Sequence, residues 1–198
     1  MYKIIKRILD VVVSFFMLAV CFLPMLLVAA AVCVDSEGPA IFKQVRLGKD
    51  GKRFDMYKFR SMKVNSEHTG TGVYSAKDDP RVTRVGRILR STSIDELPQL
   101  INILKGDMSF IGPRPVLTYH PWAYDQYTDE QKKRFAVRPG VTGWAQVNGR
   151  KTAMWTERLK FDAEYVEKLS LSFDLKILFM TVKAVLSRQD NLNVEKTV

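Results

Sequence analysis

The chain has 198 residues, which is enough for one domain with a buried core plus an additional segment. Lysine and arginine number 31 against 21 aspartates and glutamates, so the formal net charge is +10 and an anionic partner is favoured: nucleic acid, a phosphorylated substrate or anionic lipid. The sequence has only two cysteines and two histidines, without metal-ligand spacing, which excludes a disulfide framework and a zinc signature.

An apolar segment without any charged residue occupies positions 11–34. As a helix it would be roughly 36 Å long, enough to cross a hydrocarbon core of about 30 Å. Pro24 lies near its middle, where a proline kinks or breaks a helix. Basic residues flank the segment on both sides: Lys3, Lys6 and Arg7 before it, and Lys43, Arg46, Lys49, Lys52 and Arg53 after it. Because positive flanks stay in the cytoplasm, a re-entrant helix-break-helix satisfies both flanks and is favoured over a spanning helix, which satisfies one.

Two short strands are expected next, at Ile41–Leu47 and at 53–62. Asp50-Gly51 between them predicts a tight hairpin turn, whose central residues take positive φ. Lys58 lies on the second strand, where a solvated position is the ordinary interpretation. Residues 65–77 are polar and glycine-rich, and we expect a loop there.

A helix is expected to start at Asp78-Asp79-Pro80, with aspartate near the cap and proline in the first turn. Arginines follow at every third position and would form one broad basic face: Arg81, Arg84, Arg87 and Arg90. Solvent or lipid headgroups account for most of this face. Arg90 differs, because it lies closest to the acidic pair that follows.

Asp95 and Glu96 are adjacent carboxylates at the start of another expected helix. Ser93 and Glu96 match a capping box, but Pro98 would then fall at the fifth helical position and remove a backbone bond. If Asp95 is the cap, Pro98 falls at the third position and removes none. The sequence leaves both geometries open, and it predicts that the helix stops at Lys105-Gly106.

A rigid arginine follows in Gly112-Pro113-Arg114-Pro115. The two prolines fix the backbone on either side of Arg114, so its guanidinium is presented with little flexibility. Bidentate binding of phosphate requires such a presentation. Carboxylates among arginines are expected where a protein handles phosphate, although on the residues alone helix capping is the favoured interpretation of the acidic pair.

In the C-terminal part, the sequence predicts a helix within 119–136, with a start signal at Thr128. A strand is expected at 143–147 and a further helix at 155–168. On residues alone, Asp162 in the last of these reads as a surface charge that pairs with a lysine. Leu171–Leu186 is amphipathic, and it fits either core packing or a helix lying in the membrane interface. A polar tail, 189–198, ends the chain.

Seven motifs occur in order along nearly the whole chain: YKFRSM (57–62), SIDEL (93–97), KGDMS (105–109), GPRP (112–115), VRPGVTGW (137–144), QVNGR (146–150) and DAEYV (162–166). With them the chain resembles bacterial sugar transferases of the monotopic phosphoglycosyl transferase superfamily. Its length resembles the minimal, catalytic-domain-only form.

The resemblance implies a phosphoglycosyl transferase, which moves a sugar 1-phosphate from a UDP-sugar to polyprenyl (undecaprenyl) phosphate and releases UMP. Such enzymes work at the cytoplasmic face of the bacterial inner membrane, at the first membrane step of polysaccharide or glycoprotein assembly. The resemblance also implies that Asp95 is a covalent nucleophile and that Glu96 is the second member of a catalytic dyad with it. Both are implied to be associated with Mg²⁺. Further active-site positions are matched by Lys58, Arg90, Arg114, Arg150, Asp162 and Asp174.

The expected architecture is α/β and mostly helical. It consists of a re-entrant membrane hairpin over 1–37, a cytoplasmic catalytic domain over 38–188 with a β-hairpin and interfacial amphipathic helices, and the polar tail. Leu23 precedes Pro24, where the family commonly has a serine that would assist the break.

Two alternatives stay open at this stage. One is a membrane-tethered basic adaptor that binds anionic lipid or nucleic acid without catalysis, and the other is a transferase that works by a single displacement. The enzyme interpretation involves no nucleic acid. The sequence does not identify the sugar, the pathway or the oligomeric state, a homodimer included.

Overall fold

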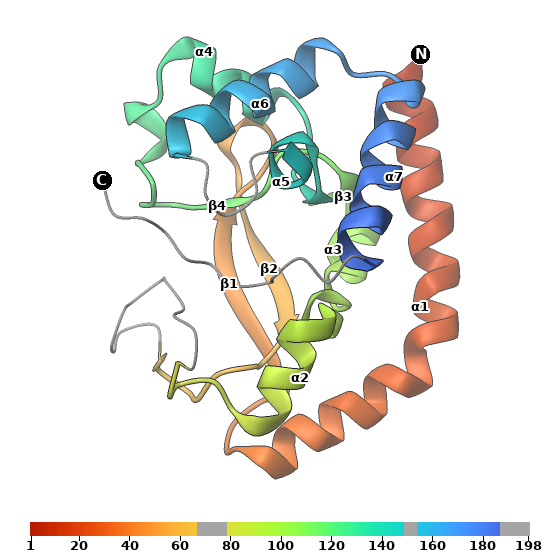
Figure 1. Ribbon diagram of the computed structural model, residues 1–198, viewed down its shortest axis with the longest axis vertical. Helices are drawn as coiled ribbons and strands as arrows, with labels where there is room; N and C mark the ends of the chain where they lie inside the picture. Colours follow the sequence, from red (N-terminus) through yellow and green to blue (C-terminus); the bar gives the residue numbers. More distant parts are fainter. Residues whose placement is uncertain (67–78, 149–153, 187–198) are drawn as a thin grey trace.

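A computed structural model describes residues 1–66, 79–148 and 154–186. The described chain is mostly helical, with one long apolar helix at its N-terminus and two small sheets (Figure 1). This confirms the expected architecture in its coarse form. The helices are α1 (Tyr2–Asp35), α2 (Arg84–Thr92), α3 (Gln99–Lys105), α4 (Asp129–Lys132), α5 (Trp144–Asn148), α6 (Trp155–Glu167) and α7 (Leu171–Leu186). Short 3-10 helices are η1 (Lys49–Gly51), η3 (Ile94–Glu96), η4 (Tyr124–Gln126) and η5 (Lys133–Ala136).

The larger sheet is antiparallel and has the strand order β2-β1-β4, from β1 (Ile41–Leu47), β2 (Arg53–Phe59) and β4 (Val116–Leu117). The expected hairpin is confirmed, since Asp50 and Gly51 in its turn have φ of 56° and 71°. The second strand ends at Phe59 and not at residue 62. In the smaller sheet, β3 (Ser109–Ile111) pairs in parallel with β5 (Gly140–Thr142).

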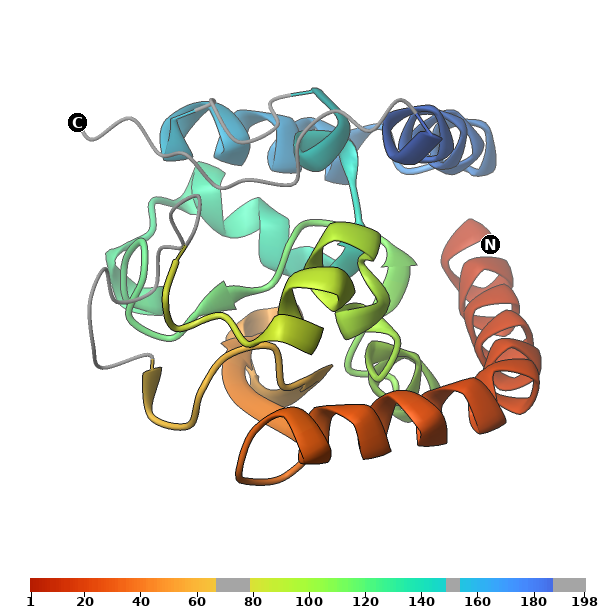
Figure 2. The ribbon, with the colours of Figure 1, turned by 60° about the horizontal axis from the view of Figure 1, so that its bottom comes forward.

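Helix α1 bends along its length and wraps around one side of the domain (Figures 1 and 2). Pro24 lies inside it and gives the bend a physical cause, because its missing N–H and its ring disturb the helix locally. The expected break thus takes the form of a bend in one helix and not of two separate helices.

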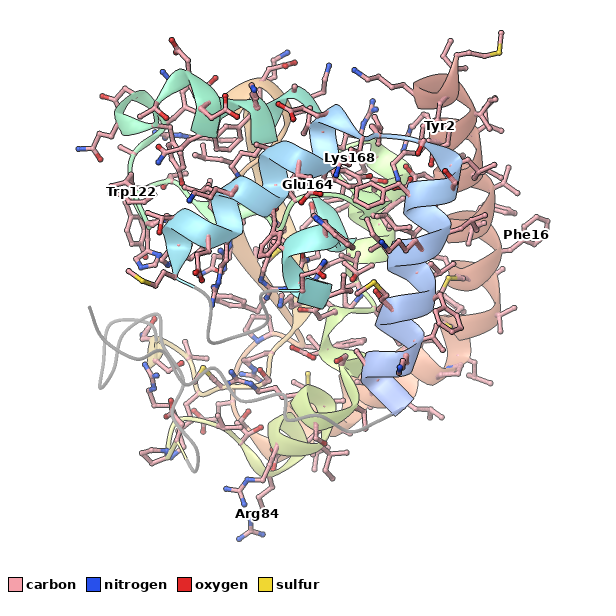
Figure 3. The ribbon with its side chains drawn as sticks, turned by 45° about the horizontal axis from the view of Figure 1, so that its top comes forward. Tyr2, Phe16, Arg84, Trp122, Glu164 and Lys168 are labelled. Atoms are coloured by element: carbon pink, nitrogen blue, oxygen red, sulfur yellow. The ribbon has the colours of Figure 1, made fainter. Side chains whose placement is uncertain are left out.

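Most of α1 is covered by nothing within the described chain. Phe22, Leu23 and Leu27 are 63%, 66% and 67% exposed, and Phe16 points away from the domain in Figure 3. The helix is long and apolar enough to cross a membrane. Such a surface is unfavourable in water, which supports an association with lipid.

The N-terminal end of α1 is tied to the domain by polar contacts. Lys6 Nζ lies 2.6 Å from Asp174 Oδ2. Arg7 donates from Nη1 to the carbonyl of Ile103 at 2.6 Å. The buried Asp10 accepts at Oδ1 from Ser109 Oγ at 3.1 Å and from the backbone N–H of residue 110 at 3.1 Å.

The C-terminal end of α1 is tied to the same domain. Arg60 donates to the carbonyls of Val32 at 3.2 Å and Ser36 at 2.7 Å, which satisfies carbonyls that a helix end leaves without partners. Asp35 accepts from the backbone N–H of Val85 at 2.9 Å. Both ends of the apolar helix therefore lie against one domain.

The expected start of the arginine-bearing helix is wrong. Asp79 does not cap a helix, because its carboxylate is held by Arg81, whose Nη2 lies 2.7 Å from Oδ2, and both residues are buried. Helix α2 begins at Arg84, where Thr83 Oγ1 accepts from the N–H of Gly86 at 2.9 Å. Arg84 is exposed and extends from the edge of the molecule (Figure 3).

Two more expectations for the C-terminal part need correction. Residues 119–136 form η4, α4 and η5 and not one helix, although the start signal at Thr128 is confirmed as a capping box with Gln131. The strand expected at 143–147 is instead α5, and the strand lies just before it, at β5. Periodicity alone cannot separate a short apolar strand from a buried helical turn. The helix predicted at 155–168 and that at Leu171–Leu186 are confirmed as α6 and α7.

The loop expected at 65–77 lies mostly outside the described residues, and the tail at 189–198 lies wholly outside them. Helix α7 is only partly covered. Ile177 is fully buried, but Leu175, Phe179 and Val182 on the same helix are 56%, 71% and 50% exposed. Core packing, one of the two options left open by the sequence, is confirmed for one face of α7. The other option, a helix lying in the membrane interface, stays a prediction, with which the exposed apolar side chains agree.

Candidate active site

The acidic pair lies in a short turn between α2 and α3. Helix α2 ends at Thr92, and Ser93 then takes the left-handed conformation, with φ 58° and ψ 16°. The Ser93 side chain makes no capping hydrogen bond, so the capping box is absent. Asp95 and Glu96 follow in η3.

Helix α3 begins only at Gln99, after Pro98. The missing N–H of Pro98 therefore removes no hydrogen bond inside that helix. Neither of the two caps left open by the sequence, Ser93 or Asp95, is used, because the helix starts after Pro98. The expected stop is confirmed, since α3 ends at Lys105 and Gly106 closes it with φ 92°.

Glu96 is bound by two cations. Its Oε1 lies 2.6 Å from Lys58 Nζ on β2 and 3.7 Å from Arg114 Nη2. Burial alone would raise the pKa of Glu96, but the charges of Lys58 and Arg114 and the hydrogen bond from Lys58 outweigh it and lower the pKa to about 2. Glu96 is therefore a firmly ionised carboxylate.

Asp95 is in a different state from its neighbour. It is 9% exposed, and no described residue donates a hydrogen bond to its carboxylate. Burial raises the pKa of Asp95; the positive charge of Lys58 opposes this and the negative charge of Glu96 adds to it, while Arg90 exerts a smaller lowering effect. A carboxylate that is desolvated and without hydrogen-bond donors keeps its lone pairs available.

Asn102 fixes the distance between Lys58 and the acidic turn. This fully buried side chain on α3 accepts from the N–H of Tyr57 at 3.0 Å and donates to the carbonyl of Asp55 at 2.7 Å, both on β2. It thus holds α3 and the turn before it against the strand that carries Lys58. Sequence reasoning missed Asn102, because a mid-helix asparagine gives no signal of the strand that it binds.

The structure brings four of the predicted residues together: Asp95, Glu96, Lys58 and Arg114, with Arg90 acting on Asp95 through its charge. The Arg114 side chain is 51% exposed, so it faces the dyad from an open side. Arg150 lies outside the described residues.

Asp162 and Asp174 are placed apart from this group. Asp162 is 2% exposed and pairs with Arg134, whose Nη2 lies 3.0 Å from Oδ2, so it is not the surface charge that the residues alone indicate. Burial raises the pKa of Asp162 to about 6, although the charges of Arg134 and Arg158 oppose the shift. Asp174 binds Lys6 of α1 and accepts from Tyr165 Oη at 2.8 Å.

Asp10 and Arg134 were also missed. For Asp10 a signal existed, since a lone carboxylate at the edge of a charge-free apolar segment needs a polar partner. For Arg134 none existed, because its partners lie 20 and 28 positions away in the chain.

The dyad suits Mg²⁺ by the chemistry of its donors. Mg²⁺ is commonly bound through one or two carboxylates together with substrate phosphates and water, and the site does not require a protein cage. Among the described residues, no group of three or more histidine, cysteine, aspartate or glutamate side chains could form such a cage. Asp95 and Glu96, two adjacent carboxylates in one short turn, fit the first kind of site.

A cavity of about 170 Å³ lies away from the dyad, between the start of α1 and the domain. Its lining is basic and includes Lys3, Lys6, Arg7, Lys49 and Arg138. Neither Asp95 nor Glu96 lines it. We place the chemistry at the dyad, where two adjacent carboxylates lie beside Lys58 and the half-exposed Arg114.

A family model described as bacterial sugar transferase matches residues 1–188. The chain is 44% identical over 184 residues to an uncharacterized sugar transferase, EpsL, of Bacillus subtilis, with 92% of this chain and 88% of that protein covered. It is 46% identical over 189 residues to the UDP-glucose:undecaprenyl-phosphate glucose-1-phosphate transferase of Caulobacter vibrioides, with 92% and 70% covered. It is 40% identical over 200 residues to the undecaprenyl-phosphate galactose phosphotransferase of Salmonella typhimurium, where 94% of this chain corresponds to 41% of that protein.

Proposed function

The chain belongs to the bacterial sugar transferase family, and we propose that it transfers a sugar 1-phosphate from a UDP-sugar to undecaprenyl phosphate and releases UMP. The relatives support the acceptor and the class of reaction, and their names include both glucose and galactose, so the sugar stays open. The basic-adaptor alternative has no support among them. The observation that carries the proposal is the pair Asp95 and Glu96 in contrasting states beside Lys58 and Arg114.

Asp95 is the nucleophile in the proposed reaction. One of its carboxylate oxygens attacks the β-phosphorus of the UDP-sugar, the bond from that phosphorus to the bridging oxygen breaks, and UMP leaves with the electron pair. A phosphosugar is then held on Asp95 as an acyl phosphate. Glu96 is the poorer nucleophile of the two, because its charge is engaged by Lys58 at 2.6 Å and its pKa is lowered to about 2.

The second step restores the enzyme. A phosphate oxygen of undecaprenyl phosphate attacks the phosphosugar, the bond to Asp95 breaks, and the product diphosphate leaves with the carboxylate regenerated. Dividing the transfer in two means that the soluble and the lipid substrate never need to meet in one complex.

Lys58, Arg90 and Arg114 reduce the repulsion between two anions. The nucleophile and its target are both negatively charged, so the attack needs positively charged side chains beside the transferring phosphoryl group. Arg114 is suited to this, since its guanidinium is half exposed and offers a planar fork of donors. Arg150 is proposed for the same role from its motif alone.

Asp95 and Glu96 would hold Mg²⁺, which when bound supplies charge that offsets the developing negative charge of the phosphates. Glu96 orients the site whether or not the ion is present, because Lys58 and Arg114 already fix its carboxylate.

The membrane segment is proposed to re-enter on the cytoplasmic side of the inner membrane. The support is that Lys6 and Arg7 at one end of α1, and Asp35 at the other, bind the same domain. A spanning helix would place one of these ends on the far side of the membrane. The basic flanks at both ends agree with this arrangement.

Labelling of single cysteines tests the topology. In a Cys21→Ala, Cys33→Ala background, Lys3→Cys and Pro39→Cys place one thiol at each end of α1, both at exposed positions. In intact cells, an impermeant maleimide should label neither, and in inverted membrane vesicles it should label both. Labelling of one thiol in each preparation would mean a spanning helix.

Release of UMP across a panel of UDP-sugars, with undecaprenyl phosphate in detergent, tests the reaction itself. We expect one or a few UDP-sugars to support release by the wild type. No release with any UDP-sugar, while a relative assayed in parallel is active, would contradict the proposed function.

A further inference from the structure

The turn that carries Arg114 is held at three successive carbonyls. The carbonyl oxygens of residues 113–115 accept, in that order, from the backbone N–H of Gly140 at 2.9 Å, from Arg134 Nη2 at 2.7 Å and from Arg46 Nη1 at 3.2 Å. The prolines on both sides of Arg114 have no N–H, so local backbone donors are scarce. The middle carbonyl, that of Arg114 itself, is held by a side chain.

Arg134 reaches this carbonyl from the interior. Its side chain is 3% exposed, and the same Nη2 that binds the Arg114 carbonyl lies 3.0 Å from Asp162 Oδ2. A buried guanidinium without a counter-ion is strongly unfavourable, so Arg134 depends on Asp162, which is itself 2% exposed. A chain of contacts thus runs from Asp162 through Arg134 to the backbone of Arg114, and from the Arg114 guanidinium to Glu96.

The pair is a costly way to obtain stability alone. A buried ion pair is often no more stabilising than apolar residues of similar volume, because both charges lose their hydration. Arg134 Nη1 and Asp162 Oδ1 are also buried without a hydrogen-bond partner among the described residues, which adds to the cost. What the pair provides, and apolar side chains do not, is a donor for the Arg114 carbonyl.

We propose that Arg134, held by Asp162, is a positioning residue that fixes the Arg114 turn so that the Arg114 guanidinium meets the dyad. The inference rests on the proposed function, in which Arg114 binds the transferring phosphate. It also changes the role of Asp162: the carboxylate acts through Arg134 and does not touch the substrate.

A double-mutant cycle in kcat/KM for UMP release separates positioning from other roles. Arg114→Ala should lower kcat/KM about 100-fold, and Arg134→Gln about 10-fold. Because Arg134 acts only through Arg114, the double variant should match Arg114→Ala within about twofold. Lys133→Gln is the matched control, because Lys133 is the adjacent residue of η5 and its partners Glu130 and Glu167 are exposed; its kcat/KM should stay within about twofold of the wild type.

Rescue and folding complete the test. Arg134→Lys keeps a buried cation that can donate to the Arg114 carbonyl, so it should recover part of the lost kcat/KM. If Arg134→Gln does not fold, as judged by thermal unfolding, the cycle is run with Arg134→Lys, and with Arg134→Gln combined with Asp162→Asn, which removes both charges and keeps amide groups. This double variant should retain more activity than Asp162→Asn alone, because Asp162→Asn leaves the buried charge of Arg134 without its counter-ion.

Losses that multiply, to roughly 1,000-fold in the double variant, would overturn the inference, because Arg134 and Asp162 would then act independently of Arg114. Full activity of a folded Arg134→Gln would overturn it as well. Both results leave the proposed function standing as long as the wild type releases UMP, whereas a wild type without UMP release removes the basis of both proposals.

Discussion

Two carboxylates in this chain have opposite surroundings. Both oxygens of the Asp174 carboxylate are engaged: Lys6 lies 2.6 Å from Oδ2, Tyr2 donates to the same oxygen, and Tyr165 donates to Oδ1 at 2.8 Å. Asp95 receives no hydrogen bond from any described residue, although cations lie close by. Both are buried, at 4% and 9% exposed.

The difference separates structure from chemistry. A buried carboxylate whose two oxygens both accept hydrogen bonds stabilises the fold, and here Asp174 joins α7 to the start of α1. A buried carboxylate with free lone pairs lowers stability and is retained where it reacts. We therefore propose that Asp95 acts in catalysis and that Asp174 attaches the membrane helix. The active-site role that the resemblance implies for Asp174 stays a prediction, which the Asp174→Asn variant below tests.

The largest effect is expected at Asp95. Asp95→Asn should lower UMP release by at least about 10⁴-fold, because an amide cannot form the acyl phosphate. Its thermal unfolding temperature should equal or exceed that of the wild type, since a desolvated charge is removed. Substantial residual turnover would argue against a nucleophilic Asp95.

The largest effect on stability is expected at Glu96, in metal-free buffer. The pKa of Glu96 is lowered from 4.5 to about 2 in the folded protein, so its contribution is present above pH 4.5 and is lost as the pH falls toward 2. The lowered pKa corresponds to a contribution of Glu96 to the free energy of unfolding on the order of 3 kcal/mol. Glu96→Gln should therefore be less stable than the wild type at pH 7, and the difference should shrink below pH 4.5. A difference that does not change with pH would contradict this account.

Asp174→Asn should lower stability and leave activity nearly unchanged, which is the reverse of Asp95→Asn. We expect the free energy of unfolding to fall by about 2 kcal/mol, because Lys6 loses its counter-ion at a largely buried site. The kcat/KM of the folded fraction should remain within about twofold of the wild type. The measurement is thermal unfolding together with UMP release in the same detergent. A loss of activity without a loss of stability would return Asp174 to the active site.

The smallest effect is expected at Glu130, whose ion pair with Lys133 at 2.7 Å is exposed on both sides. Glu130→Gln should change the free energy of unfolding by less than about 0.5 kcal/mol. It serves as the matched control for Asp174→Asn, since both changes remove one carboxylate that is paired with a lysine. An equal loss in the two variants would mean that burial does not decide the difference.

Local chemistry accounts for the elements that the sequence predicts correctly. Asp50-Gly51 requires positive φ and forms the hairpin, Gly106 stops α3, and the long periodic pattern of Leu171–Leu186 forms α7. The dyad and its cations were found through motifs, and the structure brings Lys58 and Arg114 to Glu96.

The elements that were missed depend on partners far away in the chain or on local competition. Asp79 binds Arg81 and does not cap a helix. The burial of Asp162 depends on Arg134, 28 positions earlier, and no pattern around either residue indicates the other. The contrast between Asp95 and Asp174 is of the same kind, because hydrogen-bond saturation is a property of the folded chain.

The most direct test of a nucleophilic Asp95 is to trap the intermediate. The enzyme is mixed with a UDP-sugar in the absence of undecaprenyl phosphate, quenched in acid and digested, and the peptide that contains Asp95 is examined by mass spectrometry. We predict that this peptide carries the mass of the sugar phosphate, and that Asp95→Asn does not. An active enzyme that releases UMP only when the lipid acceptor is present, with no adduct on Asp95, would contradict the account and indicate a single displacement.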